Sequence, residues 1–247
     1  NKIPLQKNKV IKPQENSDIS KKKQVANMFD NIAKSYDFLN HSLSFGMDYY
    51  WRRKAIRKLV NYPKTILDVA TGTADFAIAA SNINNVHITG IDISEKMLEI
   101  GRKKVSKKNL EKQIVLKIAD SENLPFSDES FDAITAGFGV RNFENLELGL
   151  LEMCRVLNTG GIMIILEPSE PELFPLKQVY RTYFHYILPF LGKLISKDNR
   201  AYKYLPESVD AFPKQEKFTE ILKSVGFSKV QLQPLTFGIV TLYIAIK

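Results

Sequence analysis

The sequence has few residues of several types, and each scarcity excludes a class of protein or site. It has one cysteine, Cys154, among 247 residues, which excludes an internal disulfide and a metal site built from several cysteines. No run of about 18 apolar residues occurs, so we predict no transmembrane helix. Residues 1–23 also lack the apolar central segment of a secretory signal peptide. We therefore expect a cytoplasmic protein.

Acidic residues are scarce at the N-terminus, which concentrates the positive charge of the chain there. The formal net charge is +8, and residues 1–24 carry +5 of it, with seven Lys against Glu15 and Asp18. We expect residues 1–24 to form a flexible basic arm. Because no aromatic RNA-binding motif or zinc-finger spacing accompanies the arm, we expect no nucleic-acid partner. A solvated tail is favoured over an arm attracted to anionic lipid.

From about residue 65, short apolar runs alternate with amphipathic stretches. The runs predict buried strands at Thr65–Ala70, His87–Ile93, Ile114–Ala119, Phe131–Ala136 and Ile162–Leu166. The stretches between them predict helices at Asp75–Ser81, Glu95–Lys108 and Leu146–Leu157. Strands that alternate with helices indicate a parallel sheet with right-handed crossovers. We expect Asn158–Gly161 to end a helix and turn into the fifth strand.

The two ends of the chain follow other patterns. Residues 25–60 are predicted to be a helical N-terminal cap, with Trp51–Val60 as one of its helices. A last helix at Lys214–Val225 precedes two strands, Lys229–Pro234 and Ile239–Ile246, whose short connection requires an antiparallel pair. The expected fold is one α/β domain over residues 25–247, with a mainly parallel seven-stranded sheet, an antiparallel last strand and helices on both faces. This architecture is typical of class I S-adenosylmethionine-dependent methyltransferases, which are Rossmann-like.

A turn of small residues follows the first predicted strand, within Asp68–Asp75. Small side chains let the backbone of such a turn approach a ligand closely. Of the three glycines usual in a nucleotide-binding turn only Gly72 is present, and Ala70 and Ala74 replace the others. A nicotinamide-binding domain is the alternative, but a turn with so little glycine suits a pyrophosphate poorly. S-adenosylmethionine has no pyrophosphate and is the favoured ligand.

Acidic residues end the next two predicted strands. Asp92 lies twenty residues after Gly72, where a carboxylate can accept hydrogen bonds from ribose hydroxyls. Asp120 and Ser121 follow the third strand, at the end where an adenine ring would lie. The alternative is that Asp75 or Asp120 simply caps a helix. The complete set in register favours a site for the methyl donor.

Several segments resemble the ubiquinone/menaquinone biosynthesis C-methyltransferase family, and the resemblance extends from about residue 25 to the C-terminus. The segments are Met28–His41 with Trp51 and Arg52, Leu67–Asp75, Asn123–Phe126, Ser130–Asp132, Phe138–Asn142, Arg155–Leu157, Gly160–Gly161, Leu166–Ser169 and Tyr204–Ser208. The most specific of them are Phe138–Asn142 and Tyr204–Ser208. By position, the resemblance implies S-adenosylmethionine as cofactor, bound by Gly72, Thr73, Asp92, Asp120, Ser121 and Gly137. The chain departs from the family at Ala74, a frequent glycine, and at Pro168, a more usual phenylalanine.

The resemblance implies C-methylation of a polyprenylated hydroquinone ring in quinone biosynthesis, and we expect demethylmenaquinol as substrate and menaquinol as product. The naphthoquinol is preferred over a benzoquinol only because the central segments are more similar to the menaquinone branch. Arg141 is our candidate for a catalytic cation beside the developing phenolate, with Asn142 orienting it or the substrate oxygen. Arginine stays protonated, so water or ionisation of the substrate must remove the proton. The alternative for Arg141 is a structural salt bridge.

Residues of the predicted N-terminal cap are candidates for the substrate side of the site. Tyr36, Asp37 and Asn40 line it if these helices fold over the cleft, although Asp37 could equally be a surface carboxylate. His41 and His185 are candidate bases by chemistry alone, but packing or surface roles are favoured for both. Cys154 is most simply a small buried apolar group.

An aromatic segment, Leu176–Ile195, lies within a predicted insertion at 171–205 near the substrate cleft. It is interpreted either as core or homodimer contact, or as an apolar route for the prenyl tail at the inner membrane surface. Two other functions stay open. One is a methyltransferase for another hydrophobic small molecule, and the other is a non-catalytic S-adenosylmethionine-binding scaffold of a quinone-pathway complex.

Overall fold

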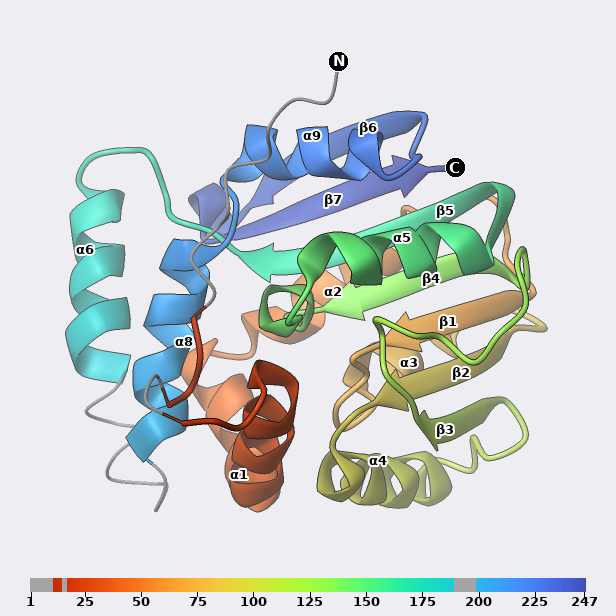
Figure 1. The fold of residues 1–247 in the computed structure, drawn as a ribbon, viewed down its shortest axis with the longest axis horizontal. Helices are drawn as coiled ribbons and strands as arrows, with labels where there is room; N and C mark the ends of the chain where they lie inside the picture. The colour runs from red at the N-terminus through yellow and green to blue at the C-terminus, as the bar shows by residue number, and fades with distance from the viewer. Residues whose placement is uncertain (1–10, 15–16, 189–198) are drawn as a thin grey trace.

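The computed structural model describes residues 11–14, 17–188 and 199–247, and it contains a seven-stranded sheet in the order β3-β2-β1-β4-β5-β7-β6 (Figure 1). The strands are β1 (Thr65–Val69), β2 (His87–Asp92), β3 (Ile114–Ile118), β4 (Phe131–Gly137), β5 (Leu157–Pro168), β6 (Lys229–Leu235) and β7 (Val240–Ile246). β1 to β5 pair in parallel, and β7 is antiparallel to both β5 and β6. The predicted fold class is confirmed.

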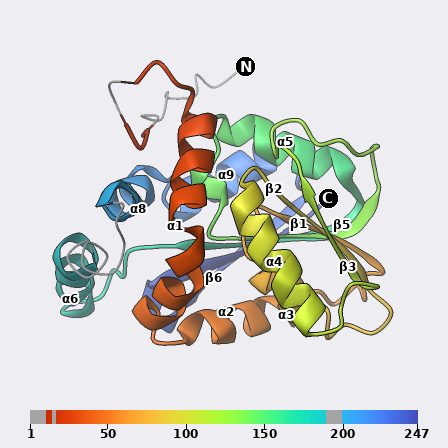
Figure 2. The ribbon, with the colours of Figure 1, turned by 90° about the horizontal axis from the view of Figure 1, so that it is seen from below.

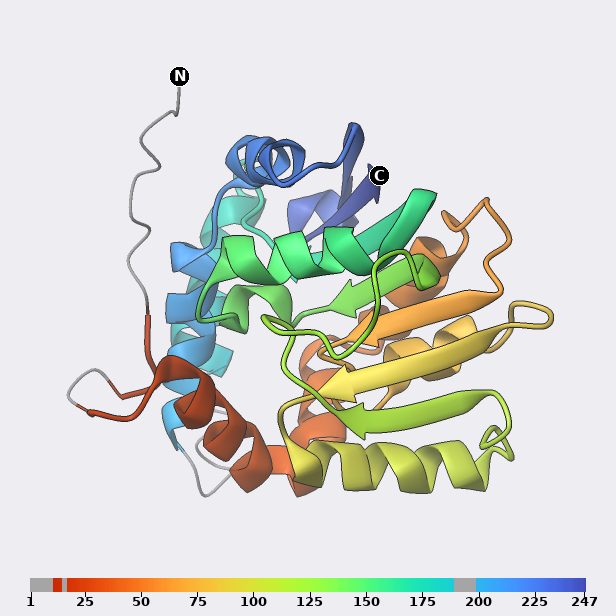
Figure 3. The ribbon, with the colours of Figure 1, turned by 45° about the vertical axis from the view of Figure 1, so that its right-hand side comes forward.

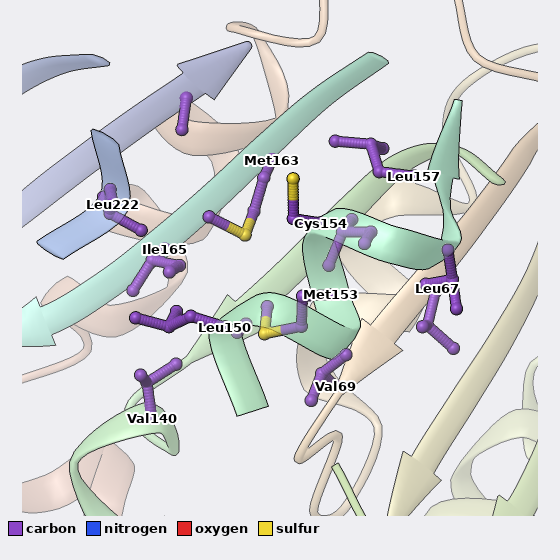
Figure 4. Packing of buried hydrophobic residues seen from close by; sticks show 14 of the residues in the cluster. Leu67, Val69, Val140, Leu150, Met153, Cys154, Leu157, Met163, Ile165 and Leu222 are labelled. Carbon is purple, nitrogen blue, oxygen red and sulfur yellow. The ribbon is translucent and has the colours of Figure 1, made fainter. Parts of the chain in front are cut away.

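Helices cover both faces of the sheet because alternate side chains of each buried strand point to opposite faces. α2 (Met47–Ile56), α3 (Asp75–Ala80) and α4 (Glu95–Lys107) lie on one face, and α5 (Leu146–Val156) and α9 (Gln215–Ser224) lie on the other (Figure 2). Side chains of β1 show the alternation: Ile66 packs into the core beneath α2 and α3, whereas Leu67 and Val69 pack into the core beneath α5. Figure 4 shows Leu67 and Val69 in that second core.

The remaining helices gather at the carboxyl ends of the parallel strands. These helices, which we call the cap, are α1 (Lys21–Leu43), α6 (Leu176–Thr182), its π-helical continuation η2 (Tyr183–Ile187) and α8 (Asn199–Ala211). Figures 1 and 3 show the arrowheads of β1, β2, β4 and β5 directed toward the cap. Val25, Met28 and Ile32 recur on one face of α1 and pack with Phe184 and Tyr204 in a third apolar cluster. The cap therefore has its own small core.

Three sequence-based expectations on the elements are wrong in detail. β3 is an edge strand, so Val115 and Ile118 are about half exposed, whereas burial on both faces was predicted. Asn158–Gly161 lie inside β5 and not in a turn before it, because the register with β4 shifts at this point and Gly160 takes a φ of +78° that absorbs the irregularity. The helix expected at Trp51–Val60 begins earlier, at Met47, and ends at Ile56.

The N-terminal arm is shorter than expected in the part that the structure describes. α1 begins at Lys21, where the hydroxyl of Ser20 accepts a hydrogen bond from the backbone of Lys23. Lys21 and Gln24 are buried against the rest of the protein. Half of the arm, and positions 189–195 of the aromatic segment, lie outside the described residues. The single domain over 25–247 stays a prediction. Of the helices in the described part, none is long and apolar enough to cross a membrane.

Candidate active site

Two neighbouring cavities lie between the cap and the carboxyl ends of the strands. The small cavity has a volume of about 70 Å³ and the large cavity about 520 Å³. Four residues line both of them: Phe29, Tyr36, Phe138 and Asn142. The two cavities therefore share one wall, formed by α1 and the segment after β4.

The loop after β1 forms one side of the small cavity. Ala70, Gly72 and Ala74 all have positive φ values, of 53°, 56° and 67°, so the chain reverses within a few residues. A residue other than glycine is strained in this left-handed backbone conformation. Ala74, the departure from the family pattern, thus carries its methyl group on a left-handed backbone. The turn brings the amide of Gly72 to the carboxylate of Asp92, 2.8 Å from Oδ2.

Asp92 is held by backbone amides at the end of β2. Its Oδ1 accepts a hydrogen bond from the amide of Ser94 at 2.9 Å, in addition to the bond that Oδ2 accepts from Gly72. Burial raises the pKa of the Asp92 carboxyl, and these amides act in the opposite direction. Gly137 lines the cavity from the end of β4, where an added Cβ would lie 3.0 Å from the ring of Phe76. The structure thus brings Gly72, Asp92 and Gly137 together, as predicted.

Asp120 and Ser121 complete the predicted set in the small cavity, and a lysine that was not predicted lies against them. The ammonium of Lys22 is 2.5 Å from Oδ2 of Asp120 and 3.3 Å from Glu122. On the preceding residue of α1, the ammonium of Lys21 donates to the carbonyl of Phe143 at 2.7 Å. Burial lowers the pKa of Lys21 to about 8. These contacts fasten the first turn of α1 over the small cavity.

Thr73 and Asp37 do not line either cavity. The hydroxyl of Thr73 donates to Oδ1 of Asp37 at 2.5 Å, and Lys104 lies 2.9 Å from Oδ2 of Asp37. Lys104 also pairs with Asp75. The network joins α1 to the loop after β1 and to α4. A ligand role for Thr73 and for Asp37 stays a prediction, and the structure gives both a role in positioning α1.

The large cavity is bounded mainly by apolar side chains of the cap, α2 and the β6–β7 connection. Pro168, the second departure from the family pattern, lies in its wall at the end of β5. Other lining residues are Met28, Ile32, Leu39, Leu43, Trp51, Leu176, Val179, Phe184, Leu188, Ala201, Leu205 and Val240. Asn40 and Tyr36 line it from α1, as predicted.

Arg141 enters the large cavity from η1 (Val140–Asn142), a short 3₁₀ turn after β4. Its NH1 lies 3.0 Å from Oε2 of Glu167, and its Nε donates to the hydroxyl of Ser208 at 3.3 Å. The same guanidinium donates to the carbonyl of Phe138. Burial raises the pKa of the Glu167 carboxyl, and the charge of Arg141 opposes that effect. Arg141 therefore forms the salt bridge that was the alternative to a catalytic role, and it also lines the large cavity.

Glu167 and Ser208 lie in segments that resemble the family, but the sequence predicted no role for either side chain. Each comes from a different segment, Leu166–Ser169 and Tyr204–Ser208, and both contact Arg141 of a third, Phe138–Asn142. The signal that could have found them is that both family-like segments contain side chains able to accept a hydrogen bond from a guanidinium.

Buried polar atoms without partners are concentrated at the large cavity. Among the described residues, the buried side-chain nitrogen and oxygen atoms that have no hydrogen-bond partner are Asn40 Nδ2, Asp75 Oδ2, Asn142 Oδ1, Tyr180 Oη and Tyr204 Oη. All of these residues except Asp75 line the large cavity. Such atoms are rare in folded proteins because desolvation without a partner is unfavourable. The mainly apolar wall of the large cavity therefore contains buried donors and acceptors that no described protein group satisfies.

The other side chains considered as bases or nucleophiles lie elsewhere. Nδ1 of His41 is 2.7 Å from Asp48, and its ring stacks on Tyr49 at 4.5 Å. His185 lies 3.7 Å from Asp210. Neither histidine lines a cavity, which agrees with the favoured packing and surface roles. Cys154 is buried in α5, and burial raises the pKa of its thiol, as expected for an inert apolar group.

Known methyltransferases are similar to this chain over at least 90% of its length. The chain is 52% identical to the demethylmenaquinone methyltransferase of Bacteroides fragilis over 239 residues, 96% of this chain and 97% of the relative. It is 48% identical to the ubiquinone/menaquinone biosynthesis C-methyltransferase of Geotalea daltonii, over 90% of this chain and 96% of the relative.

The fold also matches a solved S-adenosylmethionine-dependent methyltransferase of Thermotoga maritima, described as a possible histamine N-methyltransferase. The TM-score is 0.64 at 21% identity, and the match covers 90% of this chain and 99% of that one. The likeness supports the fold only. The model of the ubiE/COQ5 methyltransferase family matches residues 17–247. The chain therefore belongs to the ubiE/COQ5 methyltransferase family, as its motifs predicted, and it is an S-adenosylmethionine-dependent methyltransferase.

Proposed function

We propose that this protein methylates a ring carbon of a polyprenylated hydroquinone and converts demethylmenaquinol to menaquinol. The observation that carries the proposal is the wall shared by the two cavities. A methyl donor on one side and an apolar acceptor on the other would meet at Tyr36, Phe138 and Asn142. The name of the Bacteroides fragilis relative supports the naphthoquinol as the acceptor.

The residues of the small cavity fit the methyl donor in chemistry. Asp92 and Asp120 offer carboxylate oxygens to ribose hydroxyls and to the amine of adenine, and Ser121, Gly72 and Gly137 complete the wall. When bound, S-adenosylmethionine supplies an electrophilic methyl group on a sulfonium. The volume of about 70 Å³ is small, since ligand pockets are typically about 300–1,000 Å³. We infer that Lys22 must release Asp120 when the donor binds.

Arg141 and Asn142 are the side chains proposed to act on the quinol. The guanidinium of Arg141 would stabilise negative charge on a ring oxygen as the hydroxyl proton leaves to water. Electron density then moves to the adjacent ring carbon, which forms its bond to the methyl group as the bond from methyl to sulfur breaks. Loss of the proton on that carbon restores the aromatic ring. Burial raises the pKa of Tyr36 to about 12, so its phenol stays protonated beside the shared wall.

The apolar wall of the large cavity suits a prenyl tail, and its mouth suits the surface of a membrane. Phe45, Val179 and Phe237 line this cavity, and their exposed fractions are 84%, 63% and 71%. Exposed apolar side chains at the rim of an apolar cavity commonly mark a lipid or ligand contact. We propose that this rim touches the bilayer from which the tail enters.

The proposal is tested with purified protein, S-adenosylmethionine and a short-chain demethylmenaquinol, with the corresponding benzoquinol in parallel. Mass spectrometry should find a naphthoquinol product heavier by one methyl group. If the donor binds and neither quinol is methylated, the scaffold interpretation is supported and the proposal fails.

The placement of the donor is tested separately. Calorimetry measures the affinity of each variant for S-adenosylmethionine in the absence of a quinol. Asp92→Ala should bind it much more weakly. The control is Asp128→Ala, which changes an exposed carboxylate remote from both cavities. If Asp92→Ala keeps the wild-type affinity, the donor lies elsewhere.

A further inference from the structure

Two phenols of the cap lie in the large cavity and take no part in the mechanism proposed above. Tyr180 belongs to α6 and Tyr204 to α8, and both hydroxyls are buried without a hydrogen-bond partner among the residues that the structure describes. Leaving a buried hydroxyl unpaired destabilises a fold, so two of them on one cavity wall indicate groups that a ligand pairs with. Their rings are fixed by packing: Tyr180 stacks on Phe184 at 5.0 Å, and Tyr204 is 3% exposed.

The geometry of α8 places Tyr204 close to Ser208, the residue that contacts Arg141. It lies four residues before Ser208, so the two side chains share one face of the helix, one turn apart. Ser208 accepts the hydrogen bond from Nε of Arg141. The phenol of Tyr204 is therefore about one helical turn from the partner of Arg141. Tyr180 lies within the electrostatic influence of Arg141 as well.

The chemistry of a hydroquinone supplies a group for these phenols. Its ring has two oxygens on opposite edges, and Arg141 with Asn142 accounts for the one beside the carbon that receives the methyl group. The other oxygen is beside the carbon that carries the prenyl tail. A cavity wall that holds the tail thus also lies near the second oxygen. Tyr180 and Tyr204 come from the two helices, α6 and α8, that contribute many of the apolar residues of that wall.

We propose that the hydroxyls of Tyr180 and Tyr204 bind the second ring oxygen of the quinol and so select a 1,4-dioxygenated ring. The assignment rests on the proposed function and adds a specificity site to it. Burial raises the pKa of both phenols, that of Tyr204 to about 12, so both are donors at neutral pH. As positioning residues they act on substrate affinity and leave the donor site unchanged.

The test compares two substrates in the wild type, Tyr180→Phe and Tyr204→Phe. One substrate is a short-chain demethylmenaquinol, and the other is 3-prenyl-1-naphthol, which keeps the hydroxyl beside the reacting carbon and lacks the second oxygen. Each variant should raise the KM of the quinol about tenfold, the loss typical of one hydrogen bond. The KM of the naphthol should not change, and neither should the affinity for S-adenosylmethionine.

Thermal unfolding separates this role from a structural one. Because the hydroxyls have no partner in the described part of the chain, their removal should leave Tm unchanged or raise it. The matched control is Tyr183→Phe in the same cavity, whose hydroxyl donates to the carbonyl of Leu43 at 2.9 Å. This control should lower Tm, because the carbonyl of Leu43 loses its hydrogen-bond partner.

Two results overturn the proposal. One is an unchanged KM for the quinol in both variants. The other is an equal rise of KM for both substrates together with a lower Tm, which indicates a packing role. The wild-type enzyme serves as the reference for the function itself: if it methylates neither substrate, the proposed function fails, whereas a wild type that is active beside unaffected variants rejects only the specificity site.

Discussion

The guanidinium of Arg141 and the carboxylate of Glu167 form a buried ion pair, with NH1 and Oε2 3.0 Å apart. Arg141 is delivered by η1 after β4, and Glu167 by the neighbouring strand β5. The side chains are 9% and 1% exposed. A pair so deeply buried holds the arginine in one orientation in the wall of the large cavity, next to Asn142 of the shared wall. Glu167 is therefore a positioning residue for the proposed catalytic cation.

Glu167→Gln should lower kcat about 10- to 100-fold with unchanged affinity for S-adenosylmethionine, because the guanidinium loses its orientation and not its charge. Removing one charge of a buried pair also destabilises a protein by about 3–5 kcal/mol, so the assay is run below the measured Tm of the variant. Glu170→Gln is the control, since Glu170 pairs with Arg181 at the surface. A wild-type kcat in Glu167→Gln contradicts the role.

Arg141→Ala should lower kcat about 100- to 1,000-fold, the loss typical when one group that stabilises a developing anion is removed. Single-turnover methylation of the quinol measures it. The control is Arg181→Ala, whose guanidinium is 58% exposed. If Arg141→Ala turns over as fast as the wild type, the arginine has only the structural role that its salt bridge allows.

Lys22→Met should bind S-adenosylmethionine more tightly than the wild type. The variant removes the ammonium that pairs with Asp120, so the donor no longer competes with Lys22 for this carboxylate. Calorimetry at low and high salt measures the gain, which should shrink at high salt as the ion pair of the wild type is screened. The control is Lys23→Met, on an exposed position of the same helix turn. Weaker binding in Lys22→Met than in Lys23→Met contradicts the competition.

Phe237→Asp should weaken binding to lipid vesicles and lower activity on a long-chain quinol more than on a short-chain one. A charge at the mouth of the large cavity must leave water when the rim meets the bilayer. Tyr62→Asp is a matched control, because both residues are exposed aromatic side chains with positive φ, and Tyr62 lines neither cavity. Vesicle co-sedimentation is the readout. Equal vesicle binding in the two variants excludes Phe237 from the contact.

Asp68 makes stability depend on pH. Burial raises the pKa of its carboxyl to about 6, although the hydroxyls of Thr71 and Thr135 donate to it. The folded state thus holds this proton more tightly than the unfolded chain, in which the pKa of the carboxyl is 3.8. The contribution of Asp68 to stability is complete below about pH 4. It decreases as pH rises through about 6, and the total change is about 3 kcal/mol.

Asp68→Asn should remove this part of the pH dependence, and urea unfolding at pH 4.5 and pH 7 measures it. Asp132→Asn is the control. Desolvation is outweighed at Asp132 by hydrogen bonds from Thr65, Lys64 and Asn158, which lower its pKa from 3.8. Its contribution is therefore lost only below about pH 4, and Asp132→Asn should leave the difference between pH 4.5 and pH 7 as in the wild type. An unchanged difference between the two pH values in Asp68→Asn contradicts the assignment.

The sequence by itself determined the fold and five residues that line the small cavity, namely Gly72, Asp92, Asp120, Ser121 and Gly137. Periodic burial is a local property of the chain, so the strands from Thr65 to Ile246 and their helices were predicted nearly at their observed bounds. Asp92 and Asp120 end neighbouring parallel strands, and such ends meet at one edge of the sheet, so their approach follows from topology alone. The family-like segments then identified the methyltransferase.

Only the tertiary structure decided how the cap completes the site. Lys22 and Asp120 are 98 residues apart, Arg141 and Ser208 are 67 apart, and Arg141 and Glu167 are 26 apart. Local periodicity contains no information on such pairs. The first two depend on how α1 and α8 pack across the ends of the strands, and the third depends on the pairing of β4 with β5. The same packing turned Thr73 and Asp37 toward each other. It also buried the hydroxyls of Tyr180 and Tyr204, two residues that line the large cavity, without a partner among the described residues.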